Sequence, residues 1–343
     1  MKNLKLGVKI GAGVIIATII VAAIVIPLIL NQFNQVISQE ESERSQARYE
    51  TLLASLQARA EAAADMANLL AQTEAVTAAM ARRDRDYLKQ EYVPIFENLK
   101  KEGLRQLHFH GPNNVTIFRA HSPGKHSDNL TSRRPDIARV NQEKRAYLGP
   151  ARGKSGLGIR GAVPAYHQGR HVGAIEFGLA FDENFVAEFK NTYDADVIFH
   201  LKDKDGFQLY AKTTDSELTT AELSKVFGGT SLLEKATIAG TPKLVRAGII
   251  SDSIGQPIGV IEIILDNQSN VAALHSVFKA IGFSVFLAAV FIGLLLFYFS
   301  RAIVRPIGQV STLLNEVAKG DFNKRLNMDR GDEIGVLSRA LDG

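Results

Sequence analysis

The sequence predicts a membrane-anchored α+β protein in which a long stalk helix carries two tandem modules, each built on an antiparallel sheet. Three observations favour this fold. The stretch GRHVGAIEFG at Gly169–Gly178 returns as GQPIGVIEII at Gly255–Ile264, which indicates two related modules. Two apolar runs, Ile10–Leu30 and Ala280–Ser300, contain no charged residue. After the first run, Asn34–Lys89 lacks glycine and proline and is rich in strong helix formers.

The repeated stretch is predicted to be a tight turn that enters a strand. Each copy holds two glycines with three residues between them, and glycine takes a positive φ without steric cost. The residues that follow are rich in Val and Ile, which favours a half-buried strand. Chance similarity between two hairpins is the alternative. Glu176 and Glu262 occupy equivalent places in the repeat, which argues for a structural task over ligand binding.

Both apolar runs are long enough to span a membrane, since a helix rises about 1.5 Å per residue and the hydrocarbon core is about 30 Å thick. The first run exceeds the usual apolar length of a signal peptide, and no clear cleavage site follows it, which favours a retained anchor. We therefore expect transmembrane helices at residues 10–32 and 280–300. Basic residues flank the runs at Lys2, Lys5, Lys9, Arg301 and Arg305.

By the positive-inside rule, these basic residues place both ends of the chain in the cytoplasm. Residues 1–9 are then a cytoplasmic N-terminus, and residues 33–279 form an extracytoplasmic sensor. Within the sensor we expect the stalk helix at residues 34–89. A membrane-distal first module follows at 90–181, and a proximal second module at 182–268. The stalk is expected to transmit a small shift, although a plain packing helix would have the same composition.

Composition excludes several classes of function. The chain of 343 residues has no cysteine, which rules out disulfides and thiol-ligated metals. Its net charge of +4 is modest and partly lies at the membrane flanks, so no nucleic-acid partner is expected. No Gly-x-Ser-x-Gly motif occurs, and the Lys-Ser pair within residues 153–156 lacks phosphate-loop spacing. The chain is therefore not predicted to be an enzyme, and no cofactor is expected.

The segment after the second apolar run, residues 301–343, shows a heptad pattern typical of packed helices. Pro306 falls in the first turn of the first helix, where its missing N–H costs little. A second heptad helix begins near Glu333 and Ile334, and the chain stops at Gly343 within it, so we expect the natural protein to continue. The apolar positions of the first helix are Ile303, Ile307, Val310, Leu314 and Val317.

These cytoplasmic residues resemble a HAMP domain: Arg-Pro-Ile after a span, two heptad helices, and Gly-Asp-Glu-Ile-Gly at the entry to the second. The region between the spans resembles a double Cache sensor, which has a long stalk helix and two PAS-like modules. The repeated Gly-x-x-[Val/Ile]-Gly-x-Ile-Glu hairpin carries this likeness. HFHGPNN…FRAHSPGKHSDNL is similar to the first module of one Cache subgroup of bacterial transmembrane receptors. The chain has no Trp, unlike the amino-acid-binding Cache pattern.

Together with DEIGVLSRALDG, these features resemble the sensory half of a methyl-accepting chemotaxis receptor. The resemblance implies a homodimer in the bacterial cytoplasmic (inner) membrane that binds a small extracytoplasmic molecule. It implies signalling to a coupling protein and a histidine kinase through a cytoplasmic domain absent from this sequence. It also implies signalling roles for Pro306, Glu333 and Ile334. A sensor histidine kinase, a cyclic-dinucleotide cyclase receptor and a tether without ligand remain alternatives.

In Cache domains the first module usually holds the ligand, so strand alternation there suggests candidate residues. His108 and His110 share one face, opposite Leu107 and Phe109, and Arg119 and His121 are expected on the face of Ile117. Arg160 and Tyr166 share a parity on a later strand. Arginine suits bidentate recognition of carboxylates, and histidine adds a donor that titrates near neutral pH. The predicted ligand is a small anion, most simply a carboxylate, and the predicted binding residues are His108, His110, Arg119, His121, Arg160 and Tyr166.

Each candidate also has a structural interpretation. The two histidines could face solvent or ligate a metal, but the sequence places no Asp, Glu or Cys beside them, so no metal site is predicted. Arg119 could instead pair with an acid such as Asp128. The Arg133–Arg134 pair is expected in a solvated loop, and the second module is expected to act as a spacer and relay.

Overall fold

The computed structural model describes residues 6–153, 156–321 and 323–343. Contacts divide the chain into two units. The sensor unit is Gln39–Ser269, and the membrane unit comprises the described residues up to Ser38 together with Asn270–Gly343. The helix α1, Leu6–Ala71, runs through both units.

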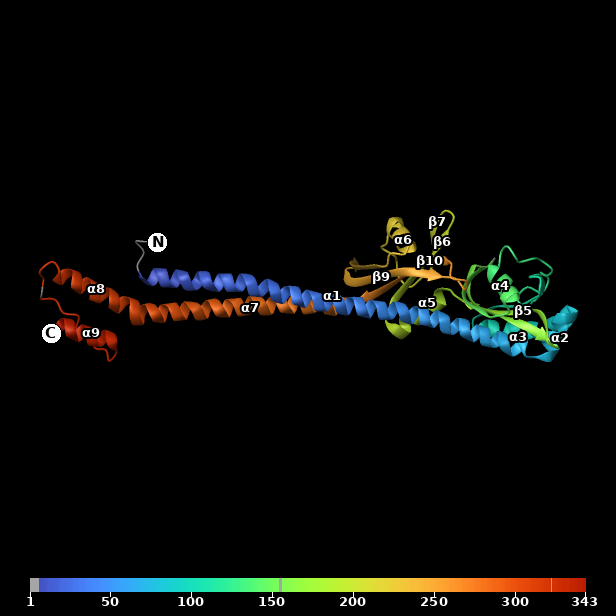
Figure 1. Ribbon diagram of the computed structural model, residues 1–343, viewed down its shortest axis with the longest axis horizontal. Helices are drawn as coiled ribbons and strands as arrows, with labels where there is room; N and C mark the ends of the chain where they lie inside the picture. The colour runs from blue at the N-terminus through green and yellow to red at the C-terminus, as the bar shows by residue number, and fades with distance from the viewer. Residues whose placement is uncertain (1–5, 154–155, 322) are drawn as a thin grey trace. The chain divides into compact units, whose positions relative to one another are not determined.

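The sensor unit contains two antiparallel sheets with the same strand order (Figure 1). The first sheet has the order β2-β1-β5-β4-β3 and the second β7-β6-β10-β9-β8. This matching topology confirms the two related modules that the repeat predicts. The strands are β1 Leu104–His110, β2 Thr116–Arg119, β3 Tyr147–Gly153, β4 Gly156–His167, β5 Arg170–Ala180, β6 Asp196–Asp203, β7 Gly206–Lys212, β8 Leu232–Ile238, β9 Thr241–Ser251 and β10 Pro257–Asp266.

The repeat has a physical cause in the contact between the last strand of each module, the closing strand β5 or β10, and its neighbour, β1 or β6. A Cβ atom at Gly173 of β5 would collide with the carbonyl oxygen of His110 on β1, and Gly173 has a φ of +137°. At the equivalent place in the second module, a Cβ atom at Gly259 would collide with the carbonyl oxygen of His200. Each module therefore needs glycine where its closing strand passes a histidine.

Replacing Gly173 by alanine is expected to destabilise the sensor unit by about 3 kcal/mol, because the new methyl group meets a backbone oxygen and the residue keeps a strained φ. Chemical denaturation of the full chain in detergent measures this change. Gly169→Ala is the control, because its φ is also positive, at +75°, but nothing lies within 4 Å of its Cβ position. Equal losses in the two variants would show that the close approach contributes nothing.

The expected stalk helix to Lys89 is wrong in its second half. The helix α1 ends at Ala71, and two shorter helices follow, α2 Glu74–Arg82 and α3 Arg85–Leu99. Arg83 takes a left-handed conformation with φ 57°, and the Asp84 side chain accepts a hydrogen bond from Tyr87 N at 3.1 Å, which starts α3. The break needs neither glycine nor proline, so their absence from this stretch could not exclude it.

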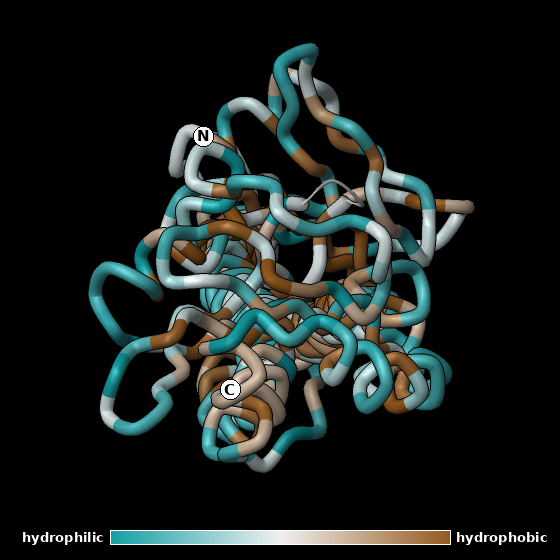
Figure 2. The backbone as a smooth tube through the Cα atoms, turned by 90° about the vertical axis from the view of Figure 1, so that its right-hand side faces the viewer, coloured by the Kyte–Doolittle hydropathy of each residue, from teal (hydrophilic) through white to brown (hydrophobic). Residues whose placement is uncertain are grey.

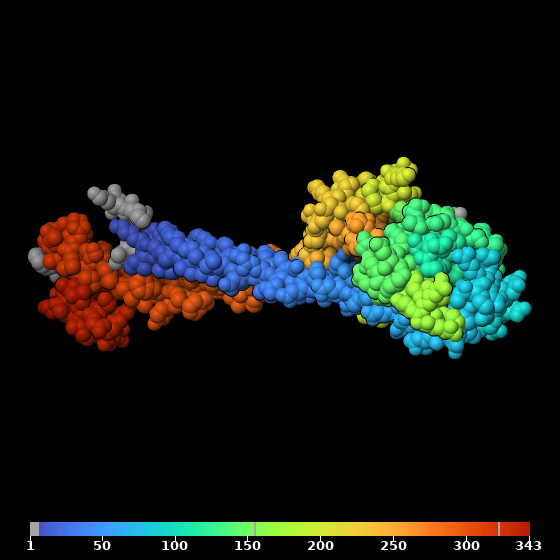
Figure 3. Space-filling view, turned by 45° about the vertical axis from the view of Figure 1, so that its right-hand side comes forward, coloured from blue at the N-terminus to red at the C-terminus, as the bar shows by residue number. Residues whose placement is uncertain are grey.

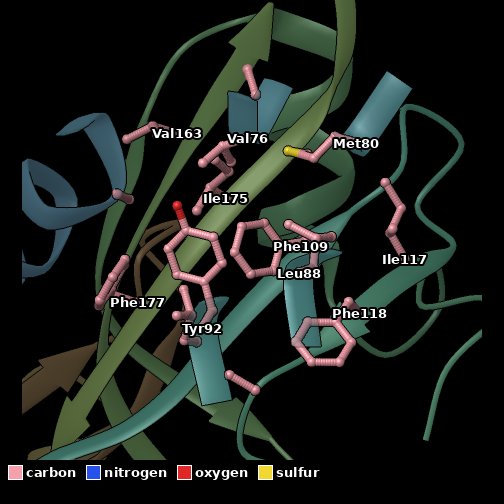
Figure 4. Packing of buried hydrophobic residues seen from close by; sticks show 14 of the residues in the cluster. Val76, Met80, Leu88, Tyr92, Phe109, Ile117, Phe118, Val163, Ile175 and Phe177 are labelled. Atoms are coloured by element: carbon pink, nitrogen blue, oxygen red, sulfur yellow. The ribbon is translucent and has the colours of Figure 1, made fainter. Parts of the chain in front are cut away.

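The helices α1, α2 and α3 cover one face of the first sheet and bury its apolar side chains (Figure 4). Phe109 of β1 lies against Tyr92 of α3, with ring centroids 5.5 Å apart. Leu107 and Phe109 are both fully buried, as strand alternation predicts. A Cβ atom at Gly161 of β4 would collide with the backbone of Ala64, so helix and strand are in direct backbone contact there.

The opposite face of the first sheet is covered by α4, Pro135–Glu143. The second sheet buries one face against α1 and α5, Glu183–Tyr193, and packs α6, Thr220–Phe227, near the other. The loops that project outward in Figure 2 are mostly hydrophilic. Each sheet is therefore packed against helices on both faces.

The start of α7, Gln268–Phe299, is tied to α1 inside the sensor unit. Asn267 donates to the Glu41 carboxylate at 2.8 Å, and Arg44 donates to the carbonyl oxygen of Asp266 at 3.0 Å. Asn267 and Glu41 are 1% and 2% exposed, so the hydrogen bond between them is shielded from water. The two helices are therefore fastened together where the second sheet ends.

Among the described residues, two helices are long and apolar enough to cross a membrane, and they begin at Gly7 and Gln268. A π-helical turn at Ser300–Val304 leads into α8, Arg305–Val317, with Pro306 in its first turn. The last helix, α9, spans Glu333–Asp342, and the Asp332 side chain accepts a hydrogen bond from Gly335 N at 3.1 Å. Along α8, Val310 is buried, whereas Ile307 and Leu314 are 37% and 48% exposed in the single chain.

Candidate ligand-binding site

A buried polar cluster lies on the face of the first sheet opposite the apolar core. His108 and His110 of β1 point to this face, and they are 3% and 0% exposed, so the solvent-facing interpretation is wrong. Their ring centroids are 3.7 Å apart. Glu176 of β5 lies opposite His108 in the strand register and is fully buried.

The Glu176 carboxylate is the centre of this cluster. Its Oε1 accepts hydrogen bonds from Arg134 at 2.6 Å and from Arg160 at 2.8 Å. Its Oε2 contacts Arg134 at 3.2 Å and His110 Nε2 at 2.9 Å. One buried carboxylate thus binds two buried guanidinium groups and one imidazole.

Burial and charge set the protonation states of these groups. Burial alone would raise the pKa of Glu176, but Arg134 and Arg160 hold that pKa well below its usual value. Burial lowers the pKa of His108, and the neighbouring His110 lowers it further. Burial also lowers the pKa of His110, although its hydrogen bond to Glu176 opposes this. At neutral pH the carboxylate is therefore charged and both imidazoles are neutral.

The expectation that Arg134 lies in a solvated loop is wrong. Its side chain is 6% exposed and binds Asp136 through two hydrogen bonds of 2.6 and 3.0 Å, besides its contacts with Glu176. Asp136 lies in the first turn of α4, so the arginine joins this helix to the sheet. The segment between β2 and β3 that carries these residues forms a continuous cover over one face of the first module (Figure 3).

Arg119 pairs with Asp128 through two hydrogen bonds of 2.8 and 2.9 Å, which confirms the structural alternative for this arginine. The pair lowers the pKa of Asp128. The expectation that Arg119 shares a face with Ile117 is wrong, because the register between β1 and β2 shifts at a bulge beside His110. Ile117 packs in the apolar core, whereas Arg119 lies opposite His108.

The other two predicted residues lie at the margin of the cluster. His121 is half-buried, its Nδ1 lies 3.3 Å from the carbonyl oxygen of Leu107, and its ring centroid is 6.0 Å from that of His108. Burial lowers the pKa of His121 to about 4. Tyr166 lies beyond a bulge in β4, is 42% exposed, and packs against His171. The cluster therefore includes His108, His110 and Arg160, adjoins Arg119 and His121, and leaves Tyr166 outside.

Arg160 also lines a cavity of about 240 Å³ beside the cluster. Its Nε atom is buried and has no hydrogen-bond partner within the described part of the chain. Gly153 leaves room for this side chain, since a Cβ atom there would collide with the Arg160 guanidinium. The cavity is lined by Arg105, Gln106, Gly156, Leu157, Gly158, Arg160, Gly178, Leu179, Ala180, Phe181, Asp182 and Tyr210.

The second module holds a reduced version of the same arrangement. His200 and Glu262 occupy the places of His110 and Glu176, and they too are hydrogen-bonded. Ser216 also donates to Glu262, at 2.5 Å, and no arginine contact with Glu262 occurs among the described residues. The two guanidinium groups are thus a feature of the first module.

Sequence reasoning missed Arg134, Asp136 and Glu176 as members of the cluster. The repeat predicts a structural task for Glu176 because its counterpart Glu262 sits in the same place, yet the two carboxylates share only the histidine partner, and the arginine partners belong to Glu176. The repeat gives the position of the carboxylate but not its surroundings. Only the pairing of β1 with β5 and the fold of the segment before α4 bring the partners together.

Two sheet modules between two candidate membrane helices, with a buried polar cluster in the first, define a transmembrane receptor that senses small molecules. Residues 38–269 match the model of the double sensory domain of two-component sensor kinases, dCache_3. The chain therefore belongs to this double Cache family. Residues 298–343 match the HAMP domain, which confirms that resemblance, and neither matched domain is catalytic. No curated protein matches the chain.

Several solved structures are similar at low identity. The ligand-binding domain of Mlp24 with asparagine is 16% identical, with a TM-score of 0.39. The aligned region covers 72% of this chain and 98% of the Mlp24 chain. The Pseudomonas aeruginosa chemoreceptor PctC with GABA is 13% identical and covers 66% and 97%, with a TM-score of 0.39. The Vibrio cholerae histidine kinase DctB sensor domain is 11% identical and covers 69% and 99%, with a TM-score of 0.42.

Proposed function

We propose that this chain is the sensory half of a chemotaxis receptor that binds a small carboxylate outside the cytoplasm. The membrane-flanking lysines and arginines support a sensor unit on the outer side of the bacterial inner membrane. The HAMP match supports a homodimer that signals to a coupling protein and a histidine kinase through a further cytoplasmic domain. Residues 33–279 act as the sensor in this proposal, and residues 301–343 as the relay.

The observation that carries the proposal is the cavity beside Arg160. A cavity of about 240 Å³ accommodates a small organic acid, and Arg105, Gln106 and Arg160 supply donors to it. The buried Nε of Arg160 lacks a partner in the described chain, and a carboxylate oxygen would satisfy it. Arg105 is 47% exposed, and its ion pair with Asp182 is long, at 3.3 Å, and therefore weak. Its guanidinium is available to bind the carboxylate of a ligand in addition to Asp182.

Binding at this cavity has a direct route to the helices. Arg160 precedes Gly161, whose backbone touches α1, and Tyr210 of the second module lines the same cavity. A ligand that draws these elements together would shift α1 against the second sheet. The HAMP helices, with Pro306 at the start of α8 and Glu333 and Ile334 at the start of α9, would then change their packing. His108, His110, Arg119 and His121 remain proposed parts of the surrounding site.

The test is calorimetric melting of the full chain in detergent with a panel of carboxylates, amines and neutral amino acids. At a hundred times the dissociation constant, a carboxylate should stabilise the protein by about 2.7 kcal/mol. We expect Arg105→Ala to weaken its binding at least tenfold, because a charge-assisted hydrogen bond is lost.

Arg152→Ala is the matched control, since Arg152 is also partly exposed, pairs weakly with Asp203 at 3.8 Å, and does not line the cavity. Binding that is lost in Arg152→Ala but kept in Arg105→Ala would move the site elsewhere. A panel in which no carboxylate binds would refute the proposed ligand class.

The second candidate is the sensory half of a histidine kinase, which the description of the matched family favours. A kinase-type output would be marked by autophosphorylation of the natural full-length protein on histidine. A chemotaxis output instead predicts control of a separate kinase in a reconstituted complex. The sensor chemistry is the same in both cases.

A further inference from the structure

We infer that His108, His110 and Glu176 form a binding site for a divalent transition metal ion of the zinc class. The three side chains come from the paired strands β1 and β5, and all three are buried. One donor atom from each residue lies within 4.8 Å of the other two. The sequence interpretation had rejected a metal because no acid lies near the histidines along the chain, but strand pairing supplies Glu176.

The distances between these donor atoms allow the three side chains to share one ion. Glu176 Oε2 lies 2.9 Å from His110 Nε2 and 3.8 Å from His108 Nδ1. The second distance is too long for a hydrogen bond. Around a tetrahedral zinc ion with bonds of about 2.0–2.1 Å, neighbouring donors lie roughly 3.3 Å apart, so small side-chain shifts bring these atoms into position.

The outer nitrogen atom of the His108 ring supports ligation. His108 Nε2 lies 3.1 Å from the Thr116 hydroxyl, which orients the ring so that Nδ1 faces Glu176. His110 Nδ1 is buried and has no hydrogen-bond partner among the residues described. When Nε2 binds a metal, the single proton of this neutral ring moves to Nδ1. Burial keeps both imidazoles neutral, which is the form that binds metals.

The two arginines determine the cost and the consequence of binding. Arg134 and Arg160 are balanced by Glu176 and Asp136, so an added dication gives the buried cluster excess positive charge. Arg134 can release Glu176 and still keep its two hydrogen bonds to Asp136. The ion would therefore replace Arg134 as the partner of Glu176 and loosen the contact between the sheet and the segment before α4.

The test uses the full chain in detergent, purified without a polyhistidine tag and stripped with a chelator. Isothermal titration is carried out with Zn²⁺, Co²⁺, Ni²⁺, Mg²⁺ and Ca²⁺. We expect one zinc ion per chain to bind and raise the melting temperature, with no binding of magnesium or calcium, which prefer oxygen ligands. Bound cobalt should show the visible absorption of a nitrogen- and oxygen-ligated site.

His108→Gln is expected to weaken zinc binding at least tenfold. This variant should fold, because glutamine is uncharged like the neutral imidazole and the described hydrogen bond of the His108 side chain is to the Thr116 hydroxyl, while its contacts with the His110 ring and with Glu176 involve no hydrogen bond. His126→Gln is the matched control, since His126 is exposed and its described hydrogen bond is to the Ser127 hydroxyl. Absence of zinc binding to the wild type, or equal binding by His108→Gln and the wild type, would overturn the inference. Arg105→Ala should keep zinc binding, which separates this site from the proposed carboxylate cavity.

Discussion

Replacing Glu176 by glutamine is expected to lower the free energy of unfolding of the sensor unit by about 3–5 kcal/mol. The substitution preserves the volume but removes the charge that binds Arg134 and Arg160, which are 6% and 3% exposed. Arg134 then keeps Asp136 as its charged partner. Arg160 loses its charged partner and keeps its hydrogen bond to the Gln106 side chain. Chemical denaturation of the full chain at pH 7.5 measures the loss.

Glu262→Gln is the matched control because Glu262 has the same position in the second module and is equally buried. Its described partners are His200 and Ser216, so its removal strands no buried arginine. We expect a clearly smaller loss than for Glu176→Gln. Similar losses in the two modules would mean that burial of the carboxylate, and not its arginine partners, sets the energy.

Acidification is expected to destabilise the sensor unit strongly between pH 6.5 and pH 4. The pKa of His121 is lowered to about 4, and the pKa values of His108 and His110 are lowered as well. In this window the unfolded chain binds protons that the folded chain does not, so stability present above pH 6.5 is lost as the pH falls. Each histidine contributes up to about 1.4 kcal/mol per pH unit. Below this window, protonation of Glu176 continues the loss in the same direction.

The measurement is the free energy of unfolding from denaturant titrations of the full chain at a series of pH values. His121→Gln should make the slope shallower by about one proton over this window. A slope that does not respond to His121→Gln would show that this histidine titrates alike in the folded and unfolded states.

The sequence predicted those features that depend on local pattern. The repeated glycines at 173 and 259 indicate two modules. At each position any Cβ atom would collide with a backbone oxygen of the neighbouring strand, so only glycine fits. Strand alternation correctly places His108 and His110 on the face opposite Leu107 and Phe109, because successive side chains of a pleated strand point to opposite faces.

The errors occurred where the structure depends on non-local partners. The face of Ile117 was wrong because a bulge changes the register beside His110, and no residue type announces that bulge. Arg134 was placed in solvent because its partner Glu176 is 42 residues away along the chain. The predicted stalk is too long because α1 ends at Ala71 and α2 at Arg82, and the left-handed conformation of Arg83 after α2 is one that glycine usually occupies.

The contact of Gly161 with Ala64 bears on how movement in the sheet reaches α1. Where side chains separate two elements, a small displacement of one element can be absorbed by rotamer changes before the other element moves. Here strand and helix meet backbone to backbone, one residue from Arg160, so there is no soft layer between them. Sub-ångström motion of β4 is therefore expected to displace α1 by a similar amount. The first module is rigidly connected to α1 at this point.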